Sequence, residues 1–213
     1  DKASANFGQI IVDGSGLPTA TSEKFKLGEQ QPDAMLGFSN TFTYKNLSLG
    51  FLIDARIGGE IFSGSNQALQ ESGNAAATVV NGERADFIVE GAVSDGSGGF
   101  TNNTTAVSPQ EYWGAITGRT GNLGINEANI YDATNIRLRN INLNYILKGA
   151  WLTNAGIQNA KVGVSANNVW MIKNNLNGID PESVFATSTN ATGFEYLSPP
   201  TTSSVFLNVS LSF

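Results

Sequence analysis

Apolar and polar residues alternate one by one along several stretches of the chain, and this period of two predicts β-strands. The final stretch is the most regular, because its apolar residues all fall on one face and only Phe206 breaks the pattern. That apolar face consists of Val205, Leu207, Val209, Leu211 and Phe213. A terminal strand with such a face has to be buried against a protein core or against lipid.

Four further runs repeat the alternation, whereas helical periodicity is nearly absent. The predicted strands cover residues 33–45, 46–57, 131–147, 160–173 and 203–213, with a sixth expected near Phe7–Val12. Lys45 and Asn46 separate the first two runs and predict a tight hairpin. Arg137 and Arg139 are in phase with the apolar residues of their strand, so we expect them either beyond the lipid or at a β-bulge.

Long and short connections alternate between the predicted strands. Residues 58–130 and 174–202 form long connections, and residues 45–46 and 148–159 form short ones. Outer-membrane barrels have long extracellular loops and short periplasmic turns. If Phe213 ends in the periplasm, both long loops are extracellular. The pattern therefore favours an all-β fold. It indicates an antiparallel transmembrane β-barrel segment in preference to a soluble β-sandwich with one solvent-exposed face.

Composition narrows the chemistry that the chain could perform. Charged residues make up 14% of the sequence, compared with roughly a quarter in soluble domains. The absence of Cys and His excludes disulfides, thiolate metal sites and His-dependent catalysis. We therefore expect that the protein is not an enzyme and that it binds no cofactor. The net charge of -6, without any basic cluster, argues against a nucleic-acid partner. The chain also opens on sequence that resembles the middle of a domain, which predicts a piece of a longer protein.

Five motifs in order carry a resemblance to a known family. They are GFSNTFTYKNLSLGFLIDARIGGEIF, YDATNIRLRNINLNYIL, VSANNVW, NGIDPES and SVFLNVSLSF. Between about Gly28 and Phe213 the chain resembles the C-terminal part of the β-barrel of SusC/RagA-like TonB-dependent outer-membrane transporters. The resemblance implies the last five or six strands of a 22-stranded barrel, with the signal and plug regions lying upstream.

The resemblance also implies partners and a location. A SusD-like surface lipoprotein would capture an oligo- or polysaccharide or a peptide, and TonB would act through an upstream region. The location would be the outer membrane of a Gram-negative bacterium. Val209, Leu211 and Phe213 would serve as the C-terminal signal for the barrel-assembly machinery. A passive porin or adhesin barrel and a soluble, secreted carbohydrate-binding β-sandwich are the alternative functions.

Two loops contain candidate contact residues. In loop 174–202 the candidates are Gly178, Asp180, Pro181 and Glu182, which either contact the lipoprotein or substrate or simply form a turn. In loop 58–130 they are Tyr112 and Trp113, whose rings either stack on substrate or pack within the loop.

Other polar groups suggest structural roles. Asp13-Gly-Ser-Gly and Asp95-Gly-Ser-Gly-Gly lack the spaced carboxylates of a calcium loop and predict turns. Asp54 and Arg56 share one face of their strand, and we expect a local ion pair between them.

Overall fold

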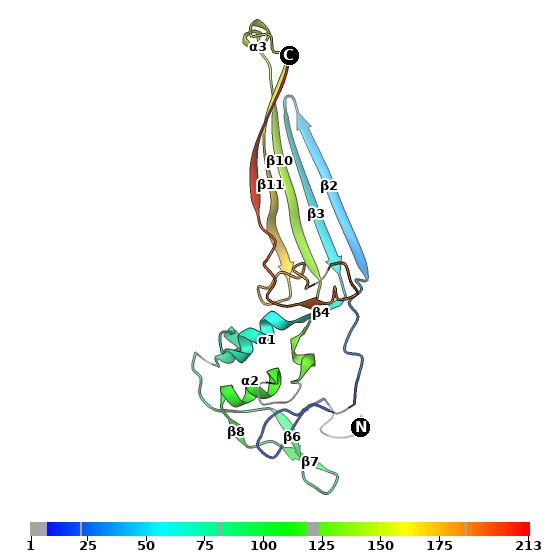
Figure 1. Ribbon diagram of the computed structural model, residues 1–213, viewed down its shortest axis with the longest axis vertical. Coiled ribbons are helices and arrows are strands. Elements are labelled where there is room, and N and C mark those ends of the chain that lie inside the picture. Colours follow the sequence, from blue (N-terminus) through cyan, green and yellow to red (C-terminus); the bar gives the residue numbers. More distant parts are fainter. Residues whose placement is uncertain (1–7, 22, 81, 119–123, 186) are drawn as a thin grey trace. The chain divides into compact units, whose positions relative to one another are not determined.

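The computed structural model describes residues 8–21, 23–80, 82–118, 124–185 and 187–213 (Figure 1). The chain forms two compact units. The loop unit contains residues 1–28 and 62–130, and the wall unit contains residues 29–61 and 131–213.

The wall unit is built on an antiparallel sheet of five strands. They are β2 (Ala34–Tyr44), β3 (Leu47–Ile57), β10 (Asn135–Leu147), β11 (Asn159–Asn174) and β13 (Ser204–Ser212), in the order β13-β11-β10-β3-β2. Alternating runs that are rich in β-branched and aromatic residues favour such strands. The predicted all-β fold is confirmed.

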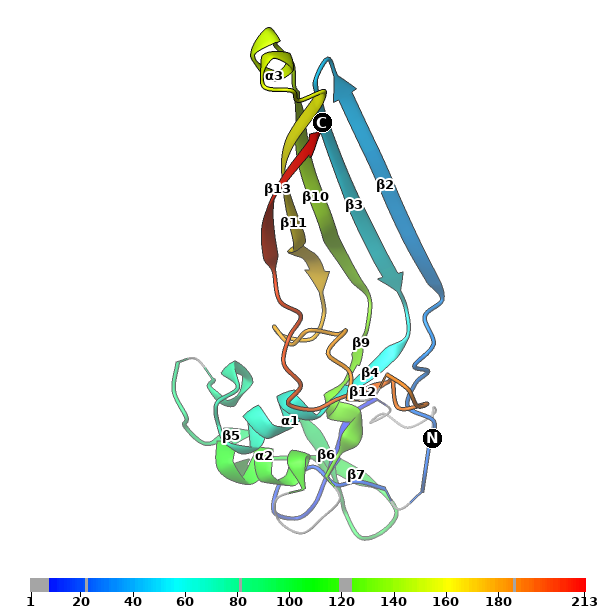
Figure 2. The ribbon, with the colours of Figure 1, turned by 45° about the horizontal axis from the view of Figure 1, so that its top comes forward.

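The short connections of this sheet and the C terminus lie at the same end of it (Figure 2). Lys45 and Asn46 join β2 to β3, and Lys45 adopts a left-handed φ of 52°. The turn from β10 to β11 contains the short helix α3 (Ala150–Asn154). The segment between β11 and β13 lies at the opposite end of the sheet (Figures 1 and 2).

The strand register places apolar residues of all five strands on one face. Leu49 lies opposite both Phe42 and Leu143, and Val164 lies opposite both Leu143 and Leu207. Directly opposed residues share a face, so these five side chains form one row across the sheet. The row is exposed in this chain, with Phe42 at 60% and Leu207 at 77%. An exposed apolar face of this extent is typical of a surface that contacts lipid.

The other face of the sheet is polar and hydrogen-bonded within itself. Asn144 donates to Asn142 over 3.2 Å, and Asn142 donates to Asn140 over 3.0 Å. Asn140 in turn donates to Asn167 of β11 over 2.7 Å. Gly50 lies opposite Asn142 and makes room for it, since a Cβ there would lie 2.8 Å from Asn142 Nδ2. Such a ladder suits a wet lumen, because lipid offers no hydrogen bonds.

A β-bulge in β10 sets the position of the two arginines. The register with β3 shifts between Leu138 and Asn140, so Arg139 is an extra residue. One extra residue inverts the phase of a strand, because side chains alternate with a period of two. Arg137 consequently lies opposite Asp54 on the polar face. The expected β-bulge is confirmed.

The loop unit contains short elements that surround a small core. Ile10–Val12, at the position of the expected sixth strand, forms β1, which pairs in parallel with β6 (Gly91–Ser94) and not with the five-stranded sheet. Val12 packs with Val89 and Val107 in this core, which explains its apolar character. The expected sixth wall strand is therefore wrong over these residues, and Phe7 lies outside the described residues. The remaining strands of this unit are β5 (Phe87–Ile88), β7 (Phe100–Asn102) and β8 (Ala106–Val107).

Short helices are a feature that the alternation did not predict. α1 (Gly64–Glu71) and α2 (Pro109–Thr117) accompany the 3-10 helices η1 (Ala76–Thr78) and η2 (Asn126–Asn129). Ser108 and Glu111 form a capping box at the start of α2, with Ser108 N donating to the Glu111 carboxylate over 3.0 Å. None of the described helices is long or apolar enough to cross a bilayer.

Three short strands, β12 (Phe194–Glu195), β4 (Glu60–Ser63) and β9 (Ile130–Asp132), form a small sheet in the order β12-β4-β9. Within the wall unit, Ile61, Ala133 and Leu176 form a buried apolar cluster. Because Leu176 belongs to this cluster, the cluster holds the start of the 174–202 segment against the residues that flank β3 and β10.

Candidate functional site

A cluster of charged residues links the 174–202 segment to the polar face of the sheet. Arg137 Nη2 lies 2.6 Å from Asp180 Oδ1, and these side chains are only 4% and 9% exposed. Arg139 Nε lies 2.5 Å from Asp54 Oδ2, and Arg139 also forms an ion pair with Glu182. We name these five residues the arginine clamp. A low dielectric strengthens such charge-assisted bonds, and burial makes the loss of one partner costly.

The residues before Asp180 form a tight turn that presents its carboxylate. Ile179 N donates to Leu176 O over 3.0 Å, and the two central residues, Asn177 and Gly178, have φ values of 50° and 92°. Asn and Gly accept this left-handed conformation readily, which explains their places in the motif. Asn174 supports the turn, because its Nδ2 donates to Ile179 O over 2.8 Å. The turn that was one of the two interpretations of Gly178 is therefore present.

Asp180 accepts hydrogen bonds on both carboxylate oxygens. Oδ1 accepts from Glu182 N over 3.0 Å as well as from Arg137, and Oδ2 accepts from Thr201 N over 3.0 Å and from Thr201 Oγ1 over 2.5 Å. Burial by itself raises the pKa of Asp180, but the bonds from Thr201, Glu182 and Arg137 outweigh it and hold the pKa below its ordinary value. The carboxylate is thus ionised and joins the two ends of the segment to β10. Pro181 beside it is fully buried.

A cavity of about 470 Å³ adjoins the arginine clamp within the wall unit. Its charged and polar lining comes from β3, β10 and the 174–202 segment, and includes Asp54, Arg56, Asn135, Arg139 and Glu182. Apolar groups such as Met35 and Val184 complete it. Glu182 and residues of the polar face of the sheet line this cavity together. Asp180 has a different role, because it holds the segment in place through its hydrogen bonds.

The expected ion pair between Asp54 and Arg56 is wrong. Asp54 pairs with Arg139, and Arg56 Nη2 donates to Gln30 O over 2.6 Å. The β-bulge explains the exchange, because it brings the Arg139 guanidinium within reach of Asp54.

Tyr112 and Trp113 lie next to each other on α2 but in different surroundings. Tyr112 packs edge-on against Phe87, with ring centroids 5.2 Å apart, and contributes to the core of the loop unit. Burial raises the pKa of Tyr112. Trp113 contacts Tyr112 edge-on at 5.1 Å and lines a separate cavity. Packing within the loop therefore describes Tyr112, and Trp113 remains the candidate for ligand contact.

The two Asp-Gly-Ser-Gly motifs form the turns that their sequence predicts. Asp13 Oδ1 accepts from Ser15 N and Leu17 N over 2.8 and 3.0 Å. Asp95 Oδ1 accepts from Ser97 N and Gly99 N over 2.8 and 2.9 Å, and the bond from Ser97 is the main cause that lowers the pKa of Asp95. Each carboxylate thus accepts hydrogen bonds from the backbone of its own turn. Within the described residues no cluster of three or more acidic side chains is suited to hold a metal ion.

The terminal strand β13 presents its apolar residues on the same face as the rest of the sheet. Val209 lies opposite Val162, and Leu211 lies opposite Ala160. Val209 and Phe213 are 61% and 77% exposed. Their role as an assembly signal stays a prediction.

The sequence indicated Asp180 and Glu182 but not the residues that hold them. Arg137 and Arg139 were noted for their phase, and Thr201 was not noted at all. One signal was available, because two arginines in the apolar phase of a membrane strand require acidic partners on the lumen side.

No protein-family model matches the chain, but individual relatives do. TonB-dependent receptor P3 of Formosa agariphila is 27% identical over 207 residues, which cover 95% of this chain and 18% of the receptor. TonB-dependent receptor P26 of the same organism is 27% identical over 169 residues, covering 79% of the chain and 15% of the receptor. The chain spans less than a fifth of the length of either relative.

Solved structures show the same fold. A chain of the RagAB peptide importer in its closed-closed state matches with a TM-score of 0.55 at 19% identity, covering 100% of this chain and 22% of that one. The open-open state matches with a TM-score of 0.54 at 18% identity, covering 86% of this chain and 17% of that one. The predicted resemblance to part of a SusC/RagA-like TonB-dependent transporter is confirmed, and the chain has the fold of an antiparallel β-barrel segment.

Proposed function

We propose that this chain is part of an outer-membrane, TonB-dependent importer of glycans or peptides. It supplies barrel wall, extracellular loops and the C-terminal assembly signal, and it performs no chemistry of its own. The observation that carries the proposal is the similarity to a TonB-dependent receptor over 95% of the chain.

The two faces of the five-stranded sheet support this role. The row through Phe42, Leu49 and Leu143 suits contact with lipid, and the ladder through Asn140 and Asn142 suits a wet lumen. Five strands leave two sheet edges unpaired, and unpaired backbone groups are costly in lipid. The wall therefore functions within a larger closed barrel, to which β2 and β13 connect by their outer edges.

A SusD-like surface lipoprotein is the partner that we propose for the loops. The end of the sheet with the arginine clamp would be extracellular, because the short connections β2–β3 and β10–β11 lie at the other end and short turns of outer-membrane barrels are periplasmic. Asp180 and Glu182 stabilise the 174–202 segment there, so the segment presents a defined surface to the lipoprotein. TonB would act through regions outside this chain, and the barrel-assembly machinery would bind the β13 end.

The test is to identify the polypeptide that contains this sequence in detergent-extracted outer membranes, together with the chains that co-purify with it. A species several times larger than 22.5 kDa, accompanied by a lipoprotein, is the expected result. Energy-dependent uptake of an oligosaccharide or a peptide should require this species and an intact TonB system. A free 22.5 kDa protein in the soluble fraction would contradict the proposal in favour of a β-sandwich. Uptake that persists without TonB would favour a passive barrel.

A further inference from the structure

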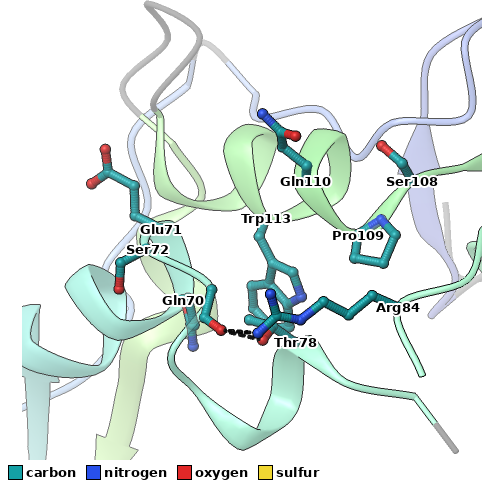
Figure 3. A pocket seen from close by; sticks show the side chains of 10 residues that line it. Gln70, Glu71, Ser72, Thr78, Arg84, Ser108, Pro109, Gln110 and Trp113 are labelled. Atoms are coloured by element: carbon teal, nitrogen blue, oxygen red, sulfur yellow. Dashed lines mark hydrogen bonds between the residues drawn. The ribbon is translucent and has the colours of Figure 1, made fainter. Parts of the chain in front are cut away.

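A cavity of about 460 Å³ lies entirely within the loop unit (Figure 3). Its lining comes from the C-terminal end of α1, from Thr78 of η1, from Arg84 and from the first turns of α2. Trp113 contributes an aromatic ring, and Gln70 and Gln110 contribute amide groups. The volume falls within the range of small-molecule sites, and an aromatic ring with a few convergent polar groups is the usual lining of such sites.

The backbone turn after α1 positions the guanidinium group of Arg84, which supplies the positive charge of this cavity. Gly73 has a φ of 73°, and its carbonyl accepts from Arg84 Nη2 over 2.6 Å and from Thr78 Oγ1 over 3.0 Å. A left-handed φ suits glycine, so the turn that aims this carbonyl depends on Gly73. Thr78 is buried at 2% exposure, which makes this side of the cavity rigid.

Arg84 and Gln70 have hydrogen-bonding capacity that the surrounding protein does not use. Across the described residues, no carboxylate lies within 4.0 Å of the Arg84 guanidinium, in contrast to Arg137 and Arg139. Gln70 is 6% exposed, and its Oε1 accepts from Asn129 Nδ2 over 3.0 Å. The structure gives Gln70 Nε2 no acceptor within the described part of the chain. An arginine with spare donors beside a half-buried indole is suited to bind an anion that has an apolar body.

We propose that this cavity binds a carboxylate end group carried by a compact polar ligand. Arg84 pairs with the carboxylate, the Trp113 indole packs against the adjoining ring or chain, and the amides of Gln70 and Gln110 bind further polar groups. The proposal rests on the importer described above, since it identifies the end of the substrate that this loop recognises. A carboxylate of this kind occurs on a uronic acid residue of an oligosaccharide and at the C terminus of a peptide.

The cavity also favours one negative charge over two. Glu71 lines it and is exposed, so a second anionic group would be repelled at that side. Neutral ligands would leave Arg84 without a counter-ion, and a hydrogen bond to a charged group accounts for about a tenfold change in affinity.

The experiment is isothermal titration calorimetry on the intact protein of which this chain is a part, purified in detergent. The probes are a trisaccharide with a single uronic acid residue and an N-acetylated trialanine with a free C terminus, which carry one negative charge each. Each is compared with its neutral counterpart, the methyl ester of the same trisaccharide or N-acetyl-trialanine amide. We expect one of the two acidic probes to bind about tenfold more tightly than its neutral counterpart. Arg84→Gln should abolish that preference, Arg84→Lys should restore part of it, and Trp113→Ala should weaken both members of the pair.

Lys148→Gln removes a positive charge from the β10–β11 turn and serves as the matched control, with no expected change in affinity. Arg84 is exposed, and its one hydrogen bond among the described residues goes to a backbone carbonyl. Its replacement should therefore leave folding intact, which retained heat-modifiable mobility on a gel would verify. Equal affinities of Arg84→Gln and the unaltered protein, or no binding of either acidic probe, would overturn the site. Import is measured separately in cells, so binding without import would contradict the importer, and import without Arg84-dependent binding would contradict this site.

Discussion

The Arg137 guanidinium lies 2.6 Å from the Asp180 carboxylate and links strand β10 to a loop residue 43 positions later in the chain. Removing one partner of such a buried pair leaves an uncompensated charge, which costs about 3–5 kcal/mol. We therefore expect Asp180→Asn to destabilise the local structure of residues 174–202 by about 3 kcal/mol. Hydrogen exchange of this segment in the intact protein measures the effect.

Asp95→Asn is the matched control for that substitution. Asp95 also accepts two backbone N–H groups, but in an exposed turn of the loop unit. It should leave exchange in residues 174–202 unchanged. Equal protection in Asp180→Asn and in the unaltered protein would show that the pair does not hold the segment.

The same carboxylate predicts how the segment responds to pH. Because the pKa of folded Asp180 lies below its ordinary value of 3.8, the stabilisation is fully present above about pH 4–5. It should be lost as the pH falls below 3.8 towards the depressed folded value. The difference in exchange between the unaltered protein and Asp180→Asn should be constant from about pH 8 to 5 and shrink only in stronger acid. A difference that changes near neutral pH would contradict this assignment.

The β-bulge at Arg139 predicts different outcomes for a deletion and a substitution. Deleting Leu138 removes the extra residue and places Arg139 opposite Ile53 on the lipid face, where an arginine costs about 2–4 kcal/mol at the bilayer midplane and less near the interface. Arg139→Gln keeps the bulge but loses the ion pairs with Asp54 and Glu182 and the hydrogen bond to Asn168. The deletion should greatly reduce the amount of folded barrel in outer membranes, as measured by heat-modifiable gel mobility. Arg139→Gln should retain most of it, and equal amounts for the two variants would contradict this account.

The contrast between the wall and the clamp shows what the sequence could predict. The strands could be predicted from the alternation of apolar and polar residues. Successive side chains of a strand point to opposite faces, so each face has one polarity. The β-bulge was one of two options, because phase reveals that Arg137 is misplaced but not how the strand corrects it. Thr201 could not be predicted as a partner of Asp180, since only the tertiary fold brings them together. The helices α1 and α2, of eight and nine residues, were too short for a clear helical period.

The asparagine ladder of the polar face predicts that Gly50 cannot be enlarged. A Cβ at Gly50 would lie 2.8 and 2.9 Å from the side-chain amide atoms of Asn142, so Gly50→Ala should destabilise the barrel by about 1–3 kcal/mol. Gly37→Ala on β2 is the control, because nothing lies within 4 Å of its Cβ position. Adding Asn142→Ala should rescue Gly50→Ala in a double-mutant cycle of unfolding free energies. Additive effects would show that the two side chains do not compete for this space.

The terminal strand predicts that one face of its last residues matters for assembly. Val209, Leu211 and Phe213 lie on the apolar face, whereas Ser212 lies on the polar face, opposite Asn159. An exposed edge strand pairs through its backbone, and alternate side chains supply the specificity. Phe213→Asp should reduce the folded transporter in outer membranes severalfold, and Phe213→Leu should retain it. Ser212→Asp introduces the same charge one residue earlier and should have little effect, so equal loss in both aspartate variants would show that charge near the terminus, and not the apolar face, limits assembly.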